Sequence, residues 1–138
     1  MGTRSTIALE FADGTVEQVY CHWDGYLDNN GAILQNYYMN PFKVKQLLAL
    51  GDFSSLRDSV EDTKEGCYSE RGEDCPARRY QNVDEYFAEC QQEEYDYILR
   101  NINGNAVWFV RCYATDGVWT TISEAYGLQE RMEEEGAW

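Results

Sequence analysis

Two short glycine-containing turns constrain the fold of this 138-residue chain more than any other feature. Asp13-Gly14 and Asn103-Gly104 each stand between stretches that are rich in β-branched and aromatic residues. Both dipeptides favour the tight turns that join antiparallel strands, because their residues tolerate a positive φ angle. We therefore predict two β-hairpins, whose strands cover residues 5–11, 15–23, 94–100 and 106–113.

Helix signals occupy much of the remaining sequence. Asn40 before Pro41 is a strong helix start, because asparagine caps the first turn and proline suits the first helical position. Gly51 is suited to end that helix, and Asn82 begins another. The predicted helices cover residues 33–38, 41–50, 83–90 and 122–135, and residues 118–121 form a further short strand. The fold class that we expect is α+β, with an antiparallel sheet of about four or five strands and helices packed on one face.

The length of the chain predicts one domain, residues 1–138. Residues 1–56 supply the first hairpin and helices, and residues 83–138 supply a helix, the second hairpin and an acidic terminal helix. Residues 57–82 between them form a polar loop, and a loop of this length is usually functional or mobile. Its Arg71 and Arg78 either pair with neighbouring acids in solvent or contact a ligand.

The segment YCHWDGY at residues 20–26 combines the only histidine of the chain with aromatic rings, a thiol and a carboxylate at a predicted strand exit. Strand alternation places Cys21 and Trp23 on one face and His22 on the other, and one of these faces belongs to the core. The structural interpretation assigns Cys21 and Trp23 to packing. The ligand interpretation stacks rings on a base and directs an arginine to a phosphate. Its candidate residues are His22, Trp23, Asp24, Tyr26 and Arg71.

Charge is the strongest signal in the composition. The chain has 25 acidic and 11 basic residues, a net charge of −14, and residues 61–138 carry most of the acidic excess. The negative electrostatic field of such a chain repels nucleic acid and attracts a basic surface, including the nucleic-acid groove of another protein. The simpler interpretation is that the acidity keeps a small protein soluble. The candidate partner-binding residues are Glu73, Asp74, Glu93, Glu94, Glu130, Glu133, Glu134 and Glu135.

The usual signatures of enzymes are missing from the sequence. It contains neither a glycine-rich phosphate loop nor a dinucleotide-binding fingerprint. His22 and the adjacent Cys21 point to opposite faces of a strand, so they cannot pair directly as base and nucleophile. Only Asp24 has the apolar neighbours that a two-carboxylate acid-base site requires. We expect a protein that is not an enzyme and that needs no cofactor.

The five cysteines are widely spaced and lack the short paired spacing of zinc sites. A zinc ion would have to use Cys21, His22, Cys67 and Cys75, and we expect no metal. A disulfide between Cys67 and Cys75 stays open, although free thiols are the default in a reducing compartment. The sequence shows neither an apolar run of about 20 residues nor an apolar signal-peptide core, so we expect a cytoplasmic protein without a membrane partner.

Several motifs are similar to those of a known group of proteins. They are TRSTIA at residues 3–8, DGTV at residues 13–16, YCHWDGY at residues 20–26 and RGED at residues 71–74. Over roughly residues 3–75 the chain resembles a family of small bacteriophage and prophage proteins. The resemblance implies a phage accessory protein in the cytoplasm of an infected bacterium, and by analogy with that class an anti-CRISPR or anti-restriction role.

Together these observations give two alternative functions. The first is a non-enzymatic inhibitor of a host defence system, whose acidic surface binds the basic nucleic-acid groove of a CRISPR effector or restriction nuclease. The second is sequestration of a nucleotide signal in a pocket around His22, Trp23, Asp24 and Tyr26. Neither alternative requires the protein to bind a nucleic-acid polymer itself, and homodimer formation stays open.

Overall fold

Both predicted hairpins form in the computed structural model, which describes residues 2–90 and 92–134. In the second hairpin, β4 (Tyr95–Ile102) and β5 (Asn105–Cys112) are joined by Asn103 and Gly104, whose φ angles are 54° and 89°. Two positive φ angles match the twist of the flanking strands. The first hairpin joins β1 (Ser5–Glu10) to β2 (Val16–Cys21) through a longer loop. There the Asp13 carboxylate accepts hydrogen bonds from the Thr15 backbone and hydroxyl, at 3.0 and 2.7 Å.

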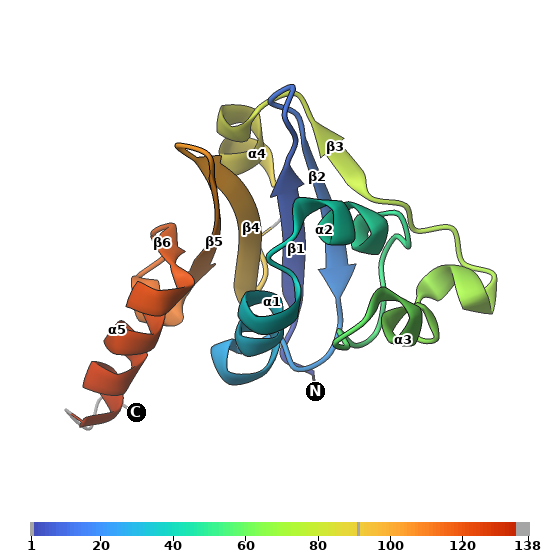
Figure 1. Cartoon of the computed structure of the whole chain (residues 1–138). Helices are drawn as coiled ribbons and strands as arrows, with labels where there is room; N and C mark the ends of the chain where they lie inside the picture. Colours follow the sequence, from blue (N-terminus) through green and yellow to red (C-terminus); the bar gives the residue numbers. More distant parts are fainter. Residues whose placement is uncertain (1, 91, 135–138) are drawn as a thin grey trace.

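The two hairpins lie side by side in one mixed sheet of six strands (Figure 1), in the order β3-β2-β1-β4-β5-β6. β1 and β4 run parallel, with Ile7 opposite Tyr97, and the other neighbours are antiparallel. The edge strands are the short β3 (Arg78–Tyr80) and β6 (Thr120–Thr121). The α+β class is confirmed, but the prediction of a wholly antiparallel sheet is wrong. The first strands of the hairpins meet at the sheet centre, and the long connection between them permits parallel pairing.

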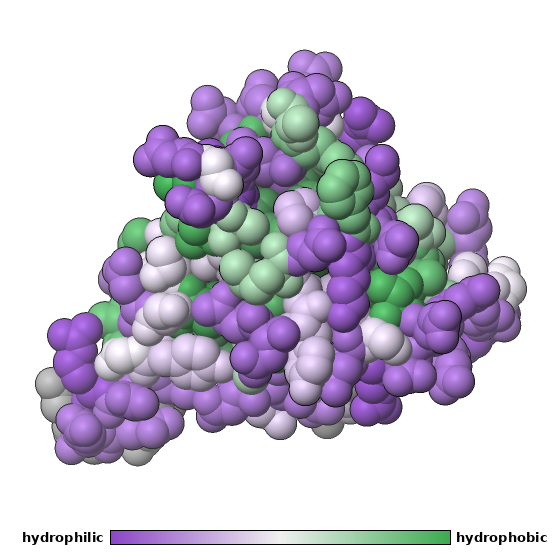
Figure 2. Space-filling view, in the orientation of Figure 1, coloured by the Kyte–Doolittle hydropathy of each residue, from purple (hydrophilic) through white to green (hydrophobic). Residues whose placement is uncertain are grey.

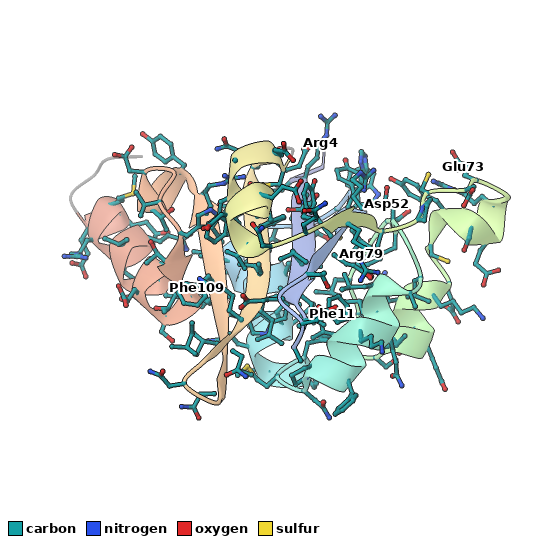
Figure 3. All side chains as sticks on the ribbon, turned by 90° about the horizontal axis from the view of Figure 1, so that it is seen from above. Arg4, Phe11, Asp52, Glu73, Arg79 and Phe109 are labelled. Atoms are coloured by element: carbon teal, nitrogen blue, oxygen red, sulfur yellow. The ribbon has the colours of Figure 1, made fainter. Side chains whose placement is uncertain are left out.

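Helices cover both faces of the sheet (Figure 1 and Figure 3), so the prediction of helices on one face is also wrong. The main core contains Ile7, Leu9 and Leu99 on the face that packs against α1, α2 and α5. Ala8 and Ile98 point to the opposite face, where α4 covers them. The central strands are therefore apolar on both sides, as strands enclosed by helices are. The helices are α1 (Ala32–Tyr37), α2 (Pro41–Leu48), α3 (Val60–Lys64), α4 (Val83–Glu89) and α5 (Ile122–Glu134).

Local capping explains where these helices begin. Asn40 accepts a hydrogen bond from the Phe42 backbone N–H at 2.9 Å, and Asn82 accepts one from Glu85 at 2.8 Å. Each cap satisfies a donor that the first helical turn leaves open. Shorter helical turns complete the chain: the π-helical η1 (Leu27–Gly31) and the 3₁₀ turns η2 (Tyr68–Arg71) and η3 (Tyr113–Thr115). None of the helices in the described part of the chain has the length and apolar character needed to cross a membrane.

The predicted polar loop, residues 57–82, contains α3, η2 and β3 instead of irregular chain alone. The Ser59 hydroxyl caps α3 by accepting from Asp62 N at 3.1 Å. The buried Thr63 hydroxyl accepts from Arg57 N at 3.0 Å. The preceding Phe53 is fully buried and pairs with both Cys21 and Cys67 through backbone bridges. These contacts fix the segment against the end of β2, where the predicted site residues lie.

Candidate functional site

The YCHWDGY segment divides between the core and the surface. Cys21 is fully buried at the end of β2, in agreement with its assignment to packing. Trp23 is 43% exposed, because the strand ends at Cys21 and the alternation does not continue. The Tyr20 hydroxyl lies 2.8 Å from His22 Nδ1, and the Trp23 ring meets the His22 ring edge-on at 4.7 Å. The His22 ring therefore contacts two aromatic rings, and within the described residues no hydrogen bond joins it to a cysteine.

The turn that follows is held rigidly against the sheet. Tyr97, fully buried on β4, donates its hydroxyl hydrogen to the Gly25 carbonyl oxygen at 2.6 Å. Gly25 N donates to the Thr3 carbonyl oxygen at 2.8 Å, and a Cβ atom on Gly25 would lie 2.6 Å from Ser5 Cβ. Only glycine allows this close approach. The preceding Asp24 has a φ angle of 58°, a conformation that aspartate tolerates, and its side chain is exposed.

Asp24 lines a pocket of about 250 Å³ together with Asp58 and Asp62. Asp62 comes from the first turn of α3 and Asp58 from the loop before it, whereas Ile33 of α1 and Leu56 contribute apolar surface. The remaining lining residues are Asn29, Ser55 and Arg57. We call this the acidic pocket, because three exposed carboxylates outnumber its single guanidinium group.

The acidic pocket is suited to an extended cation. Among residues 2–90 and 92–134, no three histidine, cysteine, aspartate or glutamate residues cluster closely enough to hold a metal ion. The cysteines of the chain are all free thiols, including Cys67 and Cys75. A lysine or arginine side chain has a long apolar stem and a charged end, which match Ile33 and the carboxylates respectively. The geometry therefore fits a basic side chain of another protein.

The predicted partner-binding carboxylates do not share one surface. Glu73 and Asp74 are exposed beside η2, on the approach to the β3 edge, and Glu130, Glu133 and Glu134 are exposed on α5 beyond the β6 edge. Figure 3 shows Glu73 and α5 at opposite ends of the molecule, and Figure 2 shows hydrophilic residues over both ends. Glu135 lies outside the described residues. A single partner groove would have to span the whole sheet to contact both groups.

Three further predicted residues have other contacts. Arg71 pairs with Glu73 at 2.9 Å and lies over the Tyr68 ring at 4.3 Å. Glu94 is exposed and accepts a hydrogen bond from the Arg4 backbone at 3.4 Å. Glu93 is half-buried, and its pKa is raised first by burial and then by the nearby Asp96 charge. Arg71 therefore pairs with its neighbour Glu73, whereas Glu93 lies beside Tyr20, the first residue of the aromatic segment.

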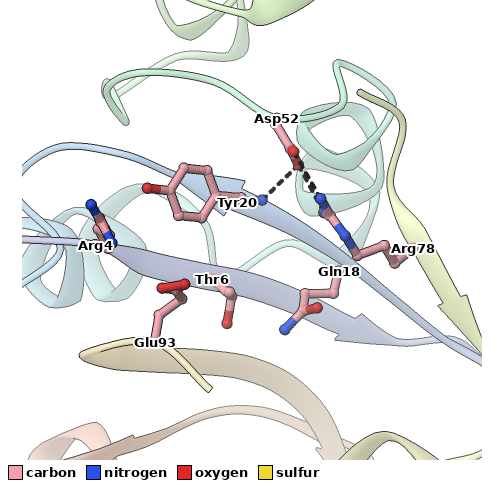
Figure 4. Close-up of a pocket in the computed structure, with 7 residues that line it drawn as sticks. All are labelled: Arg4, Thr6, Gln18, Tyr20, Asp52, Arg78 and Glu93. Atoms are coloured by element: carbon pink, nitrogen blue, oxygen red, sulfur yellow. Dashed lines mark hydrogen bonds and ion pairs between the residues drawn. The ribbon is translucent and has the colours of Figure 1, made fainter. Parts of the chain in front are cut away.

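A second pocket, of about 290 Å³, was not predicted from the sequence (Figure 4). Thr6, Gln18 and Tyr20 of the sheet line it together with charged side chains from the adjacent chain segments. Gln18, a polar residue on the strand face that it shares with Val16 and Tyr20, is the sequence signal that could have indicated it. Arg78, one of the two arginines considered for ligand contact, lines this pocket.

Comparison of the chain with protein-family models, with curated proteins and with solved structures finds no match.

Proposed function

We propose that the protein is a phage-encoded, non-enzymatic inhibitor of a host defence system. Its acidic surface would bind the basic nucleic-acid groove of a CRISPR effector or restriction nuclease. The acidic pocket is the observation that supports this binding mode, because two chain segments, residue 24 and residues 58–62, place three carboxylates around one concave site. The phage origin and the class of target rest on the sequence resemblance alone.

The distribution of ion pairs supports a negative docking surface. In the described part of the chain, six of the 11 basic side chains already pair with carboxylates. The carboxylates of Asp24, Asp58 and Asp62 have neither a hydrogen bond nor an ion pair within the described residues. They are accordingly available to a partner. Charges in solution are screened beyond about 8 Å at physiological salt. A basic group that contacts the acidic pocket directly is therefore attracted more strongly by these carboxylates than by the distant carboxylates of α5.

The neighbours of Asp24 are suited to an interface. Trp23 and Tyr26 flank it and are 43% and 41% exposed. Large aromatic residues are enriched among the positions that dominate protein–protein binding energy. Because Asp24 sits in a turn anchored by Tyr97, it can present its carboxylate with little loss of conformational entropy.

The test compares two variants with the same change of charge. In the first, Asp24→Asn, Asp58→Asn and Asp62→Asn remove the acidic pocket. In the control, Glu130→Gln, Glu133→Gln and Glu134→Gln remove three exposed carboxylates from α5. The wild-type protein is immobilised and incubated with lysate of a bacterial host at low and at high salt. Nucleic-acid-binding proteins retained only at low salt are then identified, and their affinities for both variants are measured.

We expect the pocket variant to bind its partner at least about tenfold more weakly, equivalent to about 1.4 kcal/mol. The α5 variant should keep most of the affinity. Equal losses in the two variants would show that only net charge matters and would refute the role of the pocket. Recovery of no nucleic-acid-binding protein at low salt would refute the proposed class of partner.

The exposed Trp23 ring supports a second candidate function, binding of a nucleotide signal by stacking. Small molecules released from the purified protein are identified by mass spectrometry, and nucleotides are screened for a shift in melting temperature. Trp23→Ala should abolish such a shift, whereas Tyr37→Ala, which removes another exposed ring, should not. If no nucleotide co-purifies and none changes the melting temperature, this function is excluded.

A further inference from the structure

The second pocket has a polar floor on the face of the sheet that α4 covers elsewhere. Thr6 lies directly opposite Tyr20 across β1 and β2, and Gln18 lies opposite Ala8. Thr6 and Gln18 are 4% and 1% exposed, so both are buried polar residues. The Thr6 hydroxyl already donates to Asp96 at 2.7 Å, which leaves its oxygen able to accept.

The Gln18 amide has capacity for better hydrogen bonds than it makes. Its nitrogen donates to the Tyr86 hydroxyl at 3.5 Å, and its oxygen accepts from the Tyr80 hydroxyl at 3.5 Å. Both distances exceed the usual range of about 2.7–3.2 Å. Burying an amide costs free energy when its hydrogen bonds are weak. A polar ligand in the adjoining pocket would give the Gln18 amide a stronger hydrogen bond.

One wall of the pocket is a fixed ion pair (Figure 4). Arg78 donates two hydrogen bonds to the carboxylate of Asp52, each at 3.1 Å, and these bonds raise the pKa of the guanidinium group. Asp52, only 4% exposed, also accepts from Tyr20 N at 2.9 Å. Asp52 is thereby occupied by protein donors. Arg78 remains half-exposed and keeps donors that do not face Asp52.

Across the Tyr20 ring, Arg4 and Glu93 line the other end of the pocket (Figure 4). The Arg4 backbone is fixed beside β4, since its carbonyl oxygen accepts from Tyr95 N at 3.3 Å. The Glu93 backbone N–H donates to the Asp96 carboxylate at 3.1 Å. The two side chains of opposite charge are therefore carried by anchored backbone.

We propose that this pocket binds a small zwitterion of the free amino-acid class, with its carboxylate on Arg4 and its ammonium group on Glu93. The four charged lining residues sum to zero, so a dianion would meet Glu93 and Asp52, and a simple cation would meet two arginines. A molecule that carries one positive and one negative charge can pair with an arginine and with a carboxylate of the pocket. A carboxylate can accept several donors, so the ammonium group can join the contacts that Glu93 already makes. Gln18 would receive the polar end of the ligand.

The size of the pocket limits the ligand. A volume of about 290 Å³ corresponds to roughly ten water molecules at about 30 Å³ each, and hence to about ten non-hydrogen atoms. Polar amino acids such as glutamine are of this size, whereas nucleotides are too large to be enclosed. The site is separate from the acidic pocket, since the two pockets share no lining residue. Either proposal can therefore fail without the other.

The test uses L-glutamine and two analogues that each lack one charge: glutaramate, without the ammonium group, and 4-aminobutanamide, without the carboxylate. Binding is measured by calorimetry on the full chain, and the other standard amino acids are screened in parallel by thermal shift. We expect saturable binding of L-glutamine or of another polar amino acid. For glutamine, each analogue should bind at least about tenfold more weakly, since each loses a charged hydrogen bond.

Three variants distinguish specific binding in the pocket from a general effect of the net charge. Arg4→Gln and Glu93→Gln should each weaken binding of the amino acid at least about tenfold. Arg79→Gln removes a neighbouring exposed arginine that pairs with Glu17 outside the pocket, and it should leave binding unchanged. The proposal is overturned if no amino acid binds, if glutaramate binds as well as L-glutamine, or if Arg79→Gln is as harmful as Arg4→Gln.

Discussion

Replacing Tyr97 with phenylalanine should lower the free energy of unfolding by about 2 kcal/mol. The Tyr97 side chain is fully buried, and its hydroxyl is hydrogen-bonded to the Gly25 carbonyl oxygen at 2.6 Å. The variant loses a net hydrogen bond worth about 1 kcal/mol and leaves a buried carbonyl oxygen without its donor, which costs about 1–3 kcal/mol when nothing replaces it. For a domain of this size the corresponding fall in melting temperature is about 6 °C.

Tyr95→Phe provides the matched control. Tyr95 lies two residues earlier on the same strand, and its ring stacks on that of Tyr97 at 6.4 Å, but it is only half-buried. Urea denaturation followed by tryptophan fluorescence should show a change of less than about 0.5 kcal/mol for this control. If Tyr97→Phe is equally mild, or if both variants lose the same stability, the turn at Gly25 is not anchored by this hydroxyl. The rigid presentation of Asp24 would then lose its basis.

Three further predictions concern single residues. Gly25→Ala should destabilise the protein by about 1–3 kcal/mol in urea denaturation, because the added methyl group would lie 2.6 Å from Ser5 Cβ. Gly127→Ala should raise the free energy of unfolding by about 0.5–1 kcal/mol, because this position lies within α5 with open space for a methyl group. Arg4→Ala should raise the pKa of Glu93 further in an NMR titration, because burial already raises it and the Arg4 charge lowers it. Since the pKa of Glu93 is raised in the folded state, its contribution to stability is present below the unfolded pKa and is lost as pH rises through the folded value.

The sequence predicted those elements whose signals are local. Asn103-Gly104 and the Asn40 and Asn82 caps act through their own φ angles and nearest N–H groups, and all three form as expected. The parallel contact of β1 with β4 joins residues about 90 positions apart, and its signal is not contained in either strand. A similar limit applies to β3, which pairs with β2 through only three residues within a polar segment.

In the candidate sites too, the sequence indicated residues that are near each other in the chain, but not those that only the fold brings together. The exposed turn at Asp24 was predicted to be functional from its own neighbours, but Asp58 and Asp62 join it only through the packing of α3. For Arg71 the sequence left open a ligand contact or a pair with a neighbouring acid, and in the structure it forms an ion pair with Glu73. Gln18 became a site candidate only when the fold placed charged residues around it. Proximity in the chain therefore indicated a candidate site residue, but not the residues that lie beside it in the fold.

Within the described residues the carboxylates of the acidic pocket form no ion pair, although Arg57 also lines the pocket, whereas inward-facing carboxylates have arginine partners. Asp96 is fully buried and pairs with Arg111 at 3.0 Å, and Asp52 pairs with Arg78. The three carboxylates of the acidic pocket have no such partner within the described residues, and like charges around one pocket repel each other. Their contribution to folding should therefore be small or unfavourable.

This difference leads to a last prediction, that the acidic pocket contributes to binding but not to stability. The Asp24→Asn, Asp58→Asn and Asp62→Asn variant should unfold at the same or a higher urea concentration than the wild type. Asp62 favours the start of α3 electrostatically, which limits the gain by about 0.3–1 kcal/mol. Asn tolerates the positive φ angle at position 24, so the turn is preserved. A loss of more than about 1 kcal/mol would mean that these carboxylates serve the fold. If the surface serves recognition, the variant should lose partner binding while its stability stays unchanged.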